Sequence, residues 1–151
     1  MSSFYSSKEE TSRLLIPLSG EPISAGFPSP AEDYIERGID LNKHLIKNPI
    51  STFFLRVSGH SMNNSGIYNN DLIIIDRSIK PNPGHIVVAI LDGEFTVKRL
   101  IKDQNNYYLK ADKANYPPIN LYQYSDLEIW GVAIYSIHEL QKTNKSPCPK
   151  Q

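Results

Sequence analysis

The sequence predicts a mostly β domain that follows short helices and an extended N-terminal arm. Six apolar or β-branched runs are separated by turn residues, with little helical pattern between them. Asp92-Gly93 separates two of these runs and is the strongest short hairpin signal in the chain. The 151 residues, of which 40% are hydrophobic, can bury one core without disulfides or metals. We therefore expect one barrel-like or sandwich core whose sheet edges are closed or covered.

Residues 1–28 are expected to form a flexible arm. This stretch carries seven serines and no sustained helical or strand period, so it lacks the material for a core of its own. The pattern changes at Ser29, where Ser29-Pro30-Ala31-Glu32 has the spacing of a capping box and Gly38 supplies a stop. We predict a short helix between these points and place the start of the compact domain at residue 29.

A second short helix is predicted from the N-cap residue Asp40 to the helix breaker Asn48-Pro49. The predicted strands follow over residues 52–57, 72–75, 86–91, 95–101, 107–109 and 129–137. The lysine- and proline-containing segment 141–151 is expected to be a disordered tail. The compact domain should therefore span residues 29–140.

Composition and charge exclude several function classes. With 16 basic and 16 acidic side chains, the chain lacks the positive excess that direct DNA binding requires, so any DNA role would come from a partner. Cys148 is the only cysteine, which fits the reducing cytosol, and no apolar run is long enough to span a bilayer. The four histidines show no paired ligand spacing, and no phosphate-binding loop is present. We expect a cytoplasmic protein with no metal, cofactor or membrane contact.

Ser61 is the best candidate nucleophile. It stands in Ser58-Gly59-His60-Ser61-Met62, directly after a predicted strand and before a turn rich in Gly and Asn. Asn63 occupies the place where the nucleophile elbow of an α/β-hydrolase needs a second glycine, so that class of site is contradicted. On the local sequence alone, a simple turn serine is the ordinary interpretation.

Lys98 is the candidate base for Ser61. A lysine amine can activate a serine hydroxyl only if burial depresses its pKa by roughly 2–3 units from the reference value of ~10.4. Lys98 lies in an apolar strand, on the face shared by Thr96 and Leu100, although a solvent-facing strand lysine is the ordinary interpretation. A Ser61–His60 pair is disfavoured because adjacent residues of an extended chain point to opposite faces.

The spacing of these residues resembles a known family. Ser58-Gly59-x-Ser61-Met62, followed 37 residues after Ser61 by Lys98 within Glu94–Leu100, is similar to the serine–lysine self-cleaving peptidases of the LexA/UmuD family. The segment Ala25–Tyr34 resembles the cleavage segment of the UmuD branch, with Ala25-Gly26 as the scissile pair where relatives often carry Cys-Gly. His60 stands where an acidic residue is common in the family. The resemblance covers roughly residues 22–140 and also includes segments 66–76 and 131–134.

The resemblance implies a fold, a reaction and partners. It implies the compact peptidase β-fold of the LexA/UmuD family, with Ser61 as nucleophile, Lys98 as general base and the backbone N–H groups of Ser61 and His60 as oxyanion hole. Cleavage between Ala25 and Gly26 would leave residues 26–151. The implied setting is the DNA-damage (SOS) response. A RecA–single-stranded DNA filament acts there as trigger, and the trimmed homodimer serves a UmuC-like Y-family DNA polymerase in error-prone translesion synthesis.

Three alternatives use related chemistry or the same fold. A LexA-type repressor needs an N-terminal DNA-binding domain, which an arm of about 25 residues does not supply. A type I signal peptidase also uses a serine–lysine pair but needs a membrane anchor. The alternative that stays open is a non-catalytic dimeric polymerase-binding module with the same fold.

Overall fold

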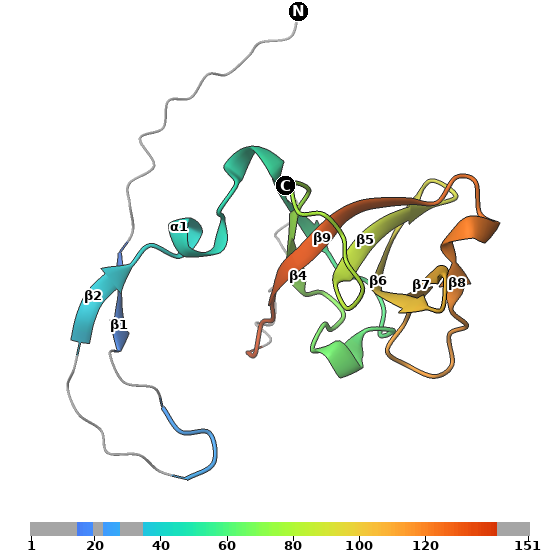
Figure 1. Ribbon diagram of the computed structural model, residues 1–151. Helices are drawn as coiled ribbons and strands as arrows, with labels where there is room; N and C mark the ends of the chain where they lie inside the picture. Colours follow the sequence, from blue (N-terminus) through green and yellow to red (C-terminus); the bar gives the residue numbers. More distant parts are fainter. Residues whose placement is uncertain (1–14, 20–22, 28–34, 142–151) are drawn as a thin grey trace, which may run out of the picture. The chain divides into compact units, whose positions relative to one another are not determined.

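The chain divides into two compact units. The structure is a computed structural model that describes residues 15–19, 23–27 and 35–141 (Figure 1). Its contacts separate residues 1–47 from residues 48–151, so the division falls between Lys47 and Asn48. The start of the compact domain at residue 29, which the sequence predicts, stays a prediction. The predicted tail lies outside the described residues except for Gln141.

The first unit contains a strand pair and one short helix. Strand β1 (Ile16–Ser19) pairs antiparallel with β2 (Ile35–Ile39), and the register shifts between Pro17 and Leu18. Helix α1 (Leu41–Leu45) begins after Asp40, whose carboxylate accepts a hydrogen bond from the Lys43 N–H at 3.1 Å. This confirms the predicted second helix and its N-cap.

One expectation for the first unit is wrong. Strand β1 lies within the segment 1–28, whose flexibility stays a prediction. The helix predicted to stop at Gly38 is not formed over residues 35–39, which are strand, while residues 29–34 lie outside the described residues. Gly38 has a packing role rather than a capping role, since a Cβ there would lie 2.9 Å from the Leu15 Cβ. Pairing across strands thus overrides the local capping signal.

The second unit is a seven-stranded antiparallel sheet, which confirms the mostly β prediction. Its strands are β3 (Thr52–Arg56), β4 (Leu72–Asp76), β5 (Ile86–Leu91), β6 (Glu94–Asp103), β7 (Asn106–Lys110), β8 (Ile119–Asn120) and β9 (Glu128–Ile137). The 3₁₀ helix η1 (Pro49–Ser51) precedes β3, whereas η2 (Asn63–Ser65) lies between β3 and β4 and η3 (Leu121–Gln123) lies between β8 and β9. The strands are ordered β3-β4-β9-β5-β6-β7-β8.

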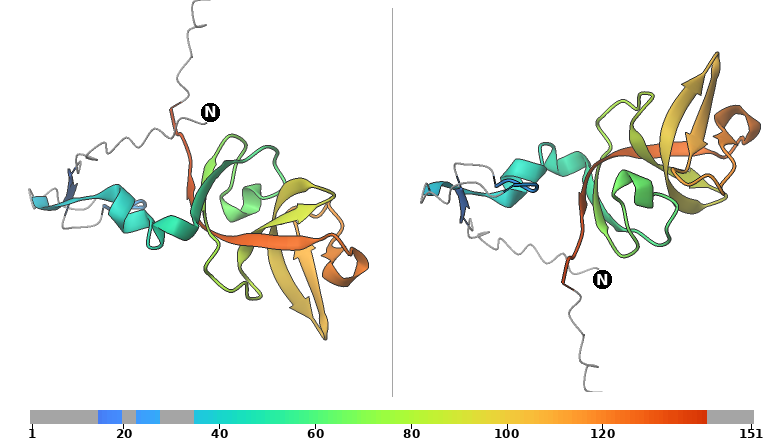
Figure 2. Two further views of the ribbon diagram at one scale, coloured as in Figure 1. Left: turned by 90° about the horizontal axis from the view of Figure 1, so that it is seen from above. Right: turned by 90° about the horizontal axis from the view of Figure 1, so that it is seen from below.

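The pairings of β9 show how the sheet is bent. The long strand β9 pairs with β4 through its second half and with β5 through its first half, and a register shift interrupts each pairing. Such bulges increase twist and bend the sheet, whose curvature Figure 2 shows from above and below. In the part of the chain that the structure describes, β3 and β8 have one partner strand each, so this sheet keeps two edges and is not closed by strand pairing.

The Asp92-Gly93 turn forms the predicted hairpin. Asp92 and Gly93 have φ values of 51° and 76°, the two positive angles that a two-residue turn of the primed type requires. Leu91 pairs with Glu94, and the register continues to place Lys98 opposite Val87. The turn therefore fixes the position of Lys98 across from a fully buried residue of β5.

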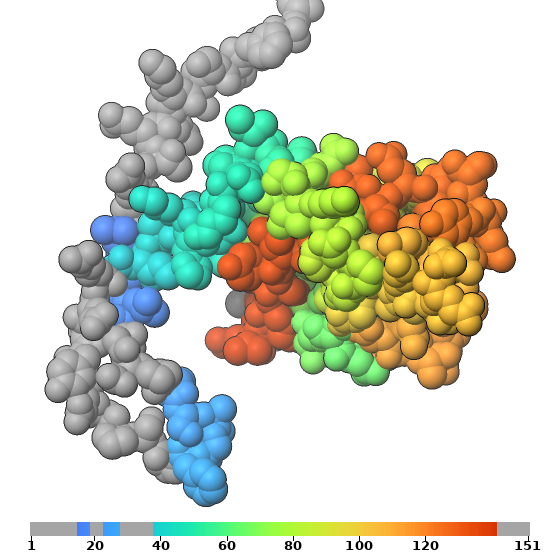
Figure 3. Space-filling view, viewed as in Figure 1, coloured from blue at the N-terminus to red at the C-terminus, as the bar shows by residue number. Residues whose placement is uncertain are grey.

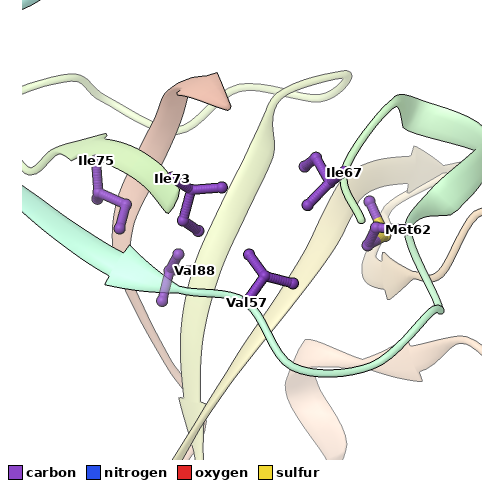
Figure 4. Close-up of a cluster of buried hydrophobic side chains, with 6 residues drawn as sticks. All are labelled: Val57, Met62, Ile67, Ile73, Ile75 and Val88. Atoms are coloured by element: carbon purple, nitrogen blue, oxygen red, sulfur yellow. The ribbon is translucent and has the colours of Figure 1, made fainter. Parts of the chain in front are cut away.

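Apolar side chains pack on both sides of β5. One cluster consists of Val57, Met62, Ile67, Ile73, Ile75 and Val88, which Figure 4 shows converging from four segments of the chain. The other consists of Val87, Ala89, Leu100, Leu109 and Val132. The neighbours Val87 and Val88 lie in different clusters because successive strand residues point to opposite faces. Burial on both faces makes β5 and its partner β6 a rigid support.

Asp76 is a buried carboxylate that fastens η1 to the end of β4. It is 2% exposed and accepts hydrogen bonds from the side chains of Asn48 (2.8 Å), Ser51 (2.9 Å) and Ser78 (2.6 Å), and from the Ser78 N–H (2.8 Å). These bonds, the Ser78 hydroxyl foremost, outweigh the effect of burial and lower the pKa of Asp76 to about 2.

We expect Asp76→Asn to lower the free energy of unfolding by about 1–3 kcal/mol at pH 7, because an amide cannot accept all four hydrogen bonds. Urea denaturation measures the loss. Because the folded pKa lies below the ordinary value of 3.8, the contribution is complete above pH 3.8 and is lost as the pH falls towards 2. Asp92→Asn is the matched control, since Asp92 is exposed and its pKa is raised by the neighbouring Asp126. Equal stability of the two variants at pH 7 would contradict the assignment.

Candidate active site

Ser61 lies at the start of a turn that leaves β3. Val57 continues the strand pairing, since its N–H donates to the Asp71 carbonyl and its carbonyl accepts from the Asn70 N–H, both at 2.8 Å. Gly59 then turns the chain with a φ of 97°, a conformation that a residue with a Cβ rarely adopts. The Asn69 side chain holds this turn by accepting from the Gly59 N–H at 2.8 Å.

The residues after Ser61 make the turn compact. Met62 is 2% exposed and is part of the first apolar cluster, so it anchors the turn from below. The Ser65 N–H donates to the Met62 carbonyl, and the Gly66 N–H donates to the Asn63 carbonyl, both at 3.0 Å. Gly66 ends η2 in the left-handed conformation with φ 77°. The segment lies at the surface of the second unit, where it is drawn in green (Figure 3).

Lys98 reaches Ser61 from strand β6. Its Nζ lies 3.3 Å from Ser61 Oγ, 3.0 Å from Thr96 Oγ1 and 3.0 Å from the Val97 carbonyl oxygen. The structure therefore brings together the two residues that the sequence selects 37 positions apart. Thr96 shares the face of Lys98, as the alternation of the strand predicts.

Lys98 is half-buried beside apolar side chains, and this burial lowers its pKa from the ordinary value of 10.5. The pocket in front of it has a volume of about 180 Å³ and is lined in part by Leu55, Val57, Val88 and Val97. In the neutral form, the amine can donate to Thr96 and Val97 while its lone pair accepts the Ser61 hydroxyl proton. The arrangement can thus supply an activated serine oxygen.

The backbone beside Ser61 offers hydrogen-bond donors. Among the hydrogen bonds of the described residues, none is donated by the N–H groups of His60 or Ser61. Two such free donors next to a nucleophile are suited to stabilise a negative oxygen. The imidazole of His60 makes no hydrogen bond to Ser61 within the described part of the chain, which agrees with the rejection of a Ser–His pair.

Ala25 and Gly26 belong to the first unit. They lie in an exposed bend with Phe27, whose N–H donates to the Ser24 hydroxyl at 3.1 Å. A side chain at Gly26 would meet no atom within 4 Å. The peptide bond between them is therefore open to solvent within its own unit.

Sequence reasoning missed two charged residues that contact the turn of Ser61. Arg99 donates to the Ser65 hydroxyl at 2.6 Å, and the Asp112 N–H donates to the Ser61 carbonyl at 3.1 Å. Arg99 stands beside Lys98 in the strand, but nothing in the sequence shows which loops meet it. Asp112 lies in an irregular segment whose position follows only from the folded chain.

Neither a metal-binding cluster nor a membrane-spanning helix is present among the described residues. Within residues 15–19, 23–27 and 35–141, no group of three or more His, Cys, Asp or Glu side chains could hold a metal ion. Over the same ranges, no helix is long and apolar enough to cross a membrane.

Comparison with known proteins identifies the class. A family model described as Peptidase S24-like matches residues 17–134, and the chain belongs to this family. This confirms the resemblance to the LexA/UmuD peptidases that the sequence predicts.

Individual relatives agree with this assignment. The chain is 42% identical to protein SamA of Salmonella typhimurium over 137 residues, covering 91% of the chain and 95% of the relative. It is 38% identical to protein MucA of Escherichia coli, with coverage of 82% and 85%. With protein ImpA of Escherichia coli it shares 56% identity over 85 residues, which is 56% of the chain and 59% of ImpA. The chain thus spans about three fifths of ImpA.

We expect Lys98 to titrate below the ordinary lysine pKa of 10.5, because burial penalises its charged form. NMR of the chain labelled with ¹³C at the lysine ε-carbons, recorded from pH 7 to pH 11, measures the midpoint. Lys98→Arg serves as control, since the assigned signal must vanish in that variant. A midpoint at or above 10.5 would show that the amine is hydrated and charged, and would remove the base from the site.

Proposed function

We propose that this protein is a serine endopeptidase that cuts its own chain between Ala25 and Gly26, with Ser61 as nucleophile and Lys98 as general base. The observation that carries the proposal is the 3.3 Å approach of Ser61 Oγ to the Nζ of a lysine whose pKa is lowered by burial. Membership of the Peptidase S24-like family supports the reaction class.

The first half of the reaction forms an acyl-enzyme. Neutral Lys98 takes the Ser61 hydroxyl proton while the oxygen attacks the carbonyl carbon of Ala25. The negative oxygen that develops is stabilised by the backbone N–H groups of His60 and Ser61. The bond between Ala25 and Gly26 then breaks, and the lysine ammonium gives its proton to the departing Gly26 amine.

The second half releases the arm. A water molecule loses a proton to neutral Lys98 and attacks the ester carbonyl between Ser61 and Ala25. The bond from Ser61 Oγ to the carbonyl carbon then breaks, and the lysine ammonium returns the proton to Ser61 Oγ, which frees residues 1–25 and restores the serine and the neutral amine. The product is residues 26–151, a chain of 126 residues because 25 of the 151 are removed. Since each chain carries one such bond, the reaction acts as a single-turnover switch.

The small residues on both sides of the bond suit this pocket. Ala25 and Gly26 present little side-chain volume, and the pocket beside Ser61 and Lys98 measures about 180 Å³. A glycine after the scissile carbonyl also lets the backbone turn without steric cost. The segment therefore can present its carbonyl to Ser61 without displacing the apolar side chains whose packing lowers the pKa of Lys98.

The proposed biological setting follows the family. We place the protein in the DNA-damage (SOS) response of the cytoplasm, where a RecA–single-stranded DNA filament triggers the cut. The 26–151 form then acts as a homodimeric accessory subunit of a UmuC-like Y-family polymerase in translesion synthesis. The similarity to SamA and MucA over most of the chain supports its place in the UmuD-like branch of the family, from which this setting is inferred. The balanced charge of the chain fits a protein whose DNA contacts come from its partners.

Incubation of the purified chain from pH 7 to pH 10 should yield the 26–151 fragment at a rate that rises with pH, because deprotonation of Lys98 produces the base. Intact mass spectrometry measures the fragment. Ser61→Ala and Lys98→Ala should each abolish it. Lys102→Ala is the matched control, since Lys102 lies on the same face of β6 but is exposed above the Tyr107 ring.

Other outcomes would overturn parts of this proposal. Cutting that survives Ser61→Ala would show that another residue is the nucleophile. A chain that stays whole at every pH, and also with a RecA–single-stranded DNA filament, would favour the non-catalytic dimeric polymerase-binding module. A fragment that begins at another residue would move the scissile bond away from Ala25-Gly26.

A further inference from the structure

We propose that Arg99 is a positioning residue. It keeps Ser61 next to Lys98 by donating a hydrogen bond to Ser65, at the other end of the turn that begins with Ser61. The proposal rests on the proposed function and adds a residue to its machinery. Lys98 and Arg99 are neighbours on β6, and their side chains leave the strand on opposite faces. Lys98 contacts Ser61 and Arg99 contacts Ser65, so the two residues hold the turn at its beginning and at its end.

The guanidinium of Arg99 makes three hydrogen bonds. It donates to the Ser65 hydroxyl at 2.6 Å, to the Gly84 carbonyl at 2.8 Å and to the Asp112 carboxylate at 3.4 Å. A planar guanidinium can serve three acceptors in fixed directions, whereas a lysine ammonium on a flexible stem holds them less rigidly. Arg99 thereby ties the turn of Ser61 to two other loops and to the strand that carries Lys98.

Backbone hydrogen bonds within the turn couple the position of Ser65 to that of Ser61. Within residues 60–67, four backbone hydrogen bonds close the turn: Asn63 N–H to His60 at 3.3 Å, Ser65 N–H to Met62 at 3.0 Å, Gly66 N–H to Asn63 at 3.0 Å and Ile67 N–H to Met62 at 3.3 Å. Since these bonds link successive residues from His60 onwards, a displacement of Ser65 displaces Ser61 as well.

Asp112 provides a second connection from Arg99 to the turn. Its backbone N–H donates to the Ser61 carbonyl at 3.1 Å, and its carbonyl accepts from the Asn64 side chain at 3.0 Å. Its side chain is only 16% exposed, and one carboxylate oxygen, Oδ2, is buried without a hydrogen-bond partner among the described residues. Arg99 is the cation that faces this carboxylate, so loss of Arg99 would leave a poorly hydrated charge that moves the segment touching Ser61.

The contact between Ser61 Oγ and Lys98 Nζ, which Arg99 maintains in this proposal, tolerates little displacement of Ser61. The Ser61–Lys98 separation of 3.3 Å is already at the long end for a hydrogen bond. A misplacement of about 1 Å at a reacting centre costs on the order of 100-fold in rate. Burial lowers the pKa of Lys98, and the side chain of Arg99 leaves β6 on the opposite face, so we expect removal of the Arg99 charge to have little effect on the proton affinity of the base. Arg99 should therefore affect the rate of cleavage and leave its pH midpoint in place.

The test compares Arg99→Met, Arg99→Lys and Ser65→Ala in the full chain, with self-cleavage followed from pH 7 to pH 10 by intact mass. Arg99→Met should lower the maximal rate by about 10–100-fold without moving the pH midpoint, and Arg99→Lys and Ser65→Ala should lie between it and the native chain. Arg77→Met is the matched control. Arg77 also donates to a backbone carbonyl, that of Trp130 at 2.9 Å, and no hydrogen bond among the described residues joins its side chain to the turn.

A second readout does not depend on cleavage. In the Ser61→Ala background, hydrogen exchange of the Ser65 and Gly66 amides should become at least about 10-fold faster with Arg99→Met, while amides of the β5–β9 ladder keep their rates. Unchanged exchange and an unchanged maximal rate would overturn the proposal, as would a shifted pH midpoint at full rate. If Arg99→Met does not fold, Arg99→Lys and Ser65→Ala decide by the same criteria. The two proposals can fail separately. If the native chain never cleaves while Arg99→Met still accelerates exchange of the Ser65 and Gly66 amides, the proposed function is contradicted and the positioning of the turn by Arg99 is supported.

Discussion

The contact between Ser61 and Lys98 is the interaction on which the remaining structure depends. A hydroxyl and an amine 3.3 Å apart are chemically inert while the amine is charged, because an ammonium has no lone pair to accept a proton. Burial changes this by lowering the pKa of Lys98. The fold must therefore keep water from one face of β6 and still leave Ser61 accessible.

The sheet meets both requirements by being packed on two sides. Val88 and Met62 belong to one apolar cluster and Leu100 to the other, so β5 and β6 are supported from both faces around Lys98. The turn that carries Ser61 is anchored by Met62 below and, in our proposal, by Arg99 at its end. The nucleophile is thus placed by a rigid scaffold while its own loop stays at the surface.

Much of the fold follows from local sequence signals. The apolar runs predict most of the strands, the Asp92-Gly93 turn predicts the β5–β6 hairpin, and the Asp40 cap predicts α1. These predictions succeed because each structure depends on residues that are close together in the sequence. The two-residue strand β8 is too short to show a period. The local sequence predicts a helix where β2 forms, because the pairing of β2 with β1 is not visible in a local window. Ser61 and Lys98 were found through their motifs and spacing. Arg99 and Asp112 were missed since their contacts exist only after distant loops meet.

The most direct test of the account compares two midpoints on the same chain. One is the pH at which the ε-carbon signal of Lys98 titrates, and the other is the pH at which the rate of self-cleavage reaches half its maximum. If neutral Lys98 is the base, the two midpoints coincide, and both lie below the ordinary lysine pKa of 10.5. A cleavage rate that stays constant while Lys98 titrates would contradict the account, because the proton on Lys98 would then have no part in the reaction.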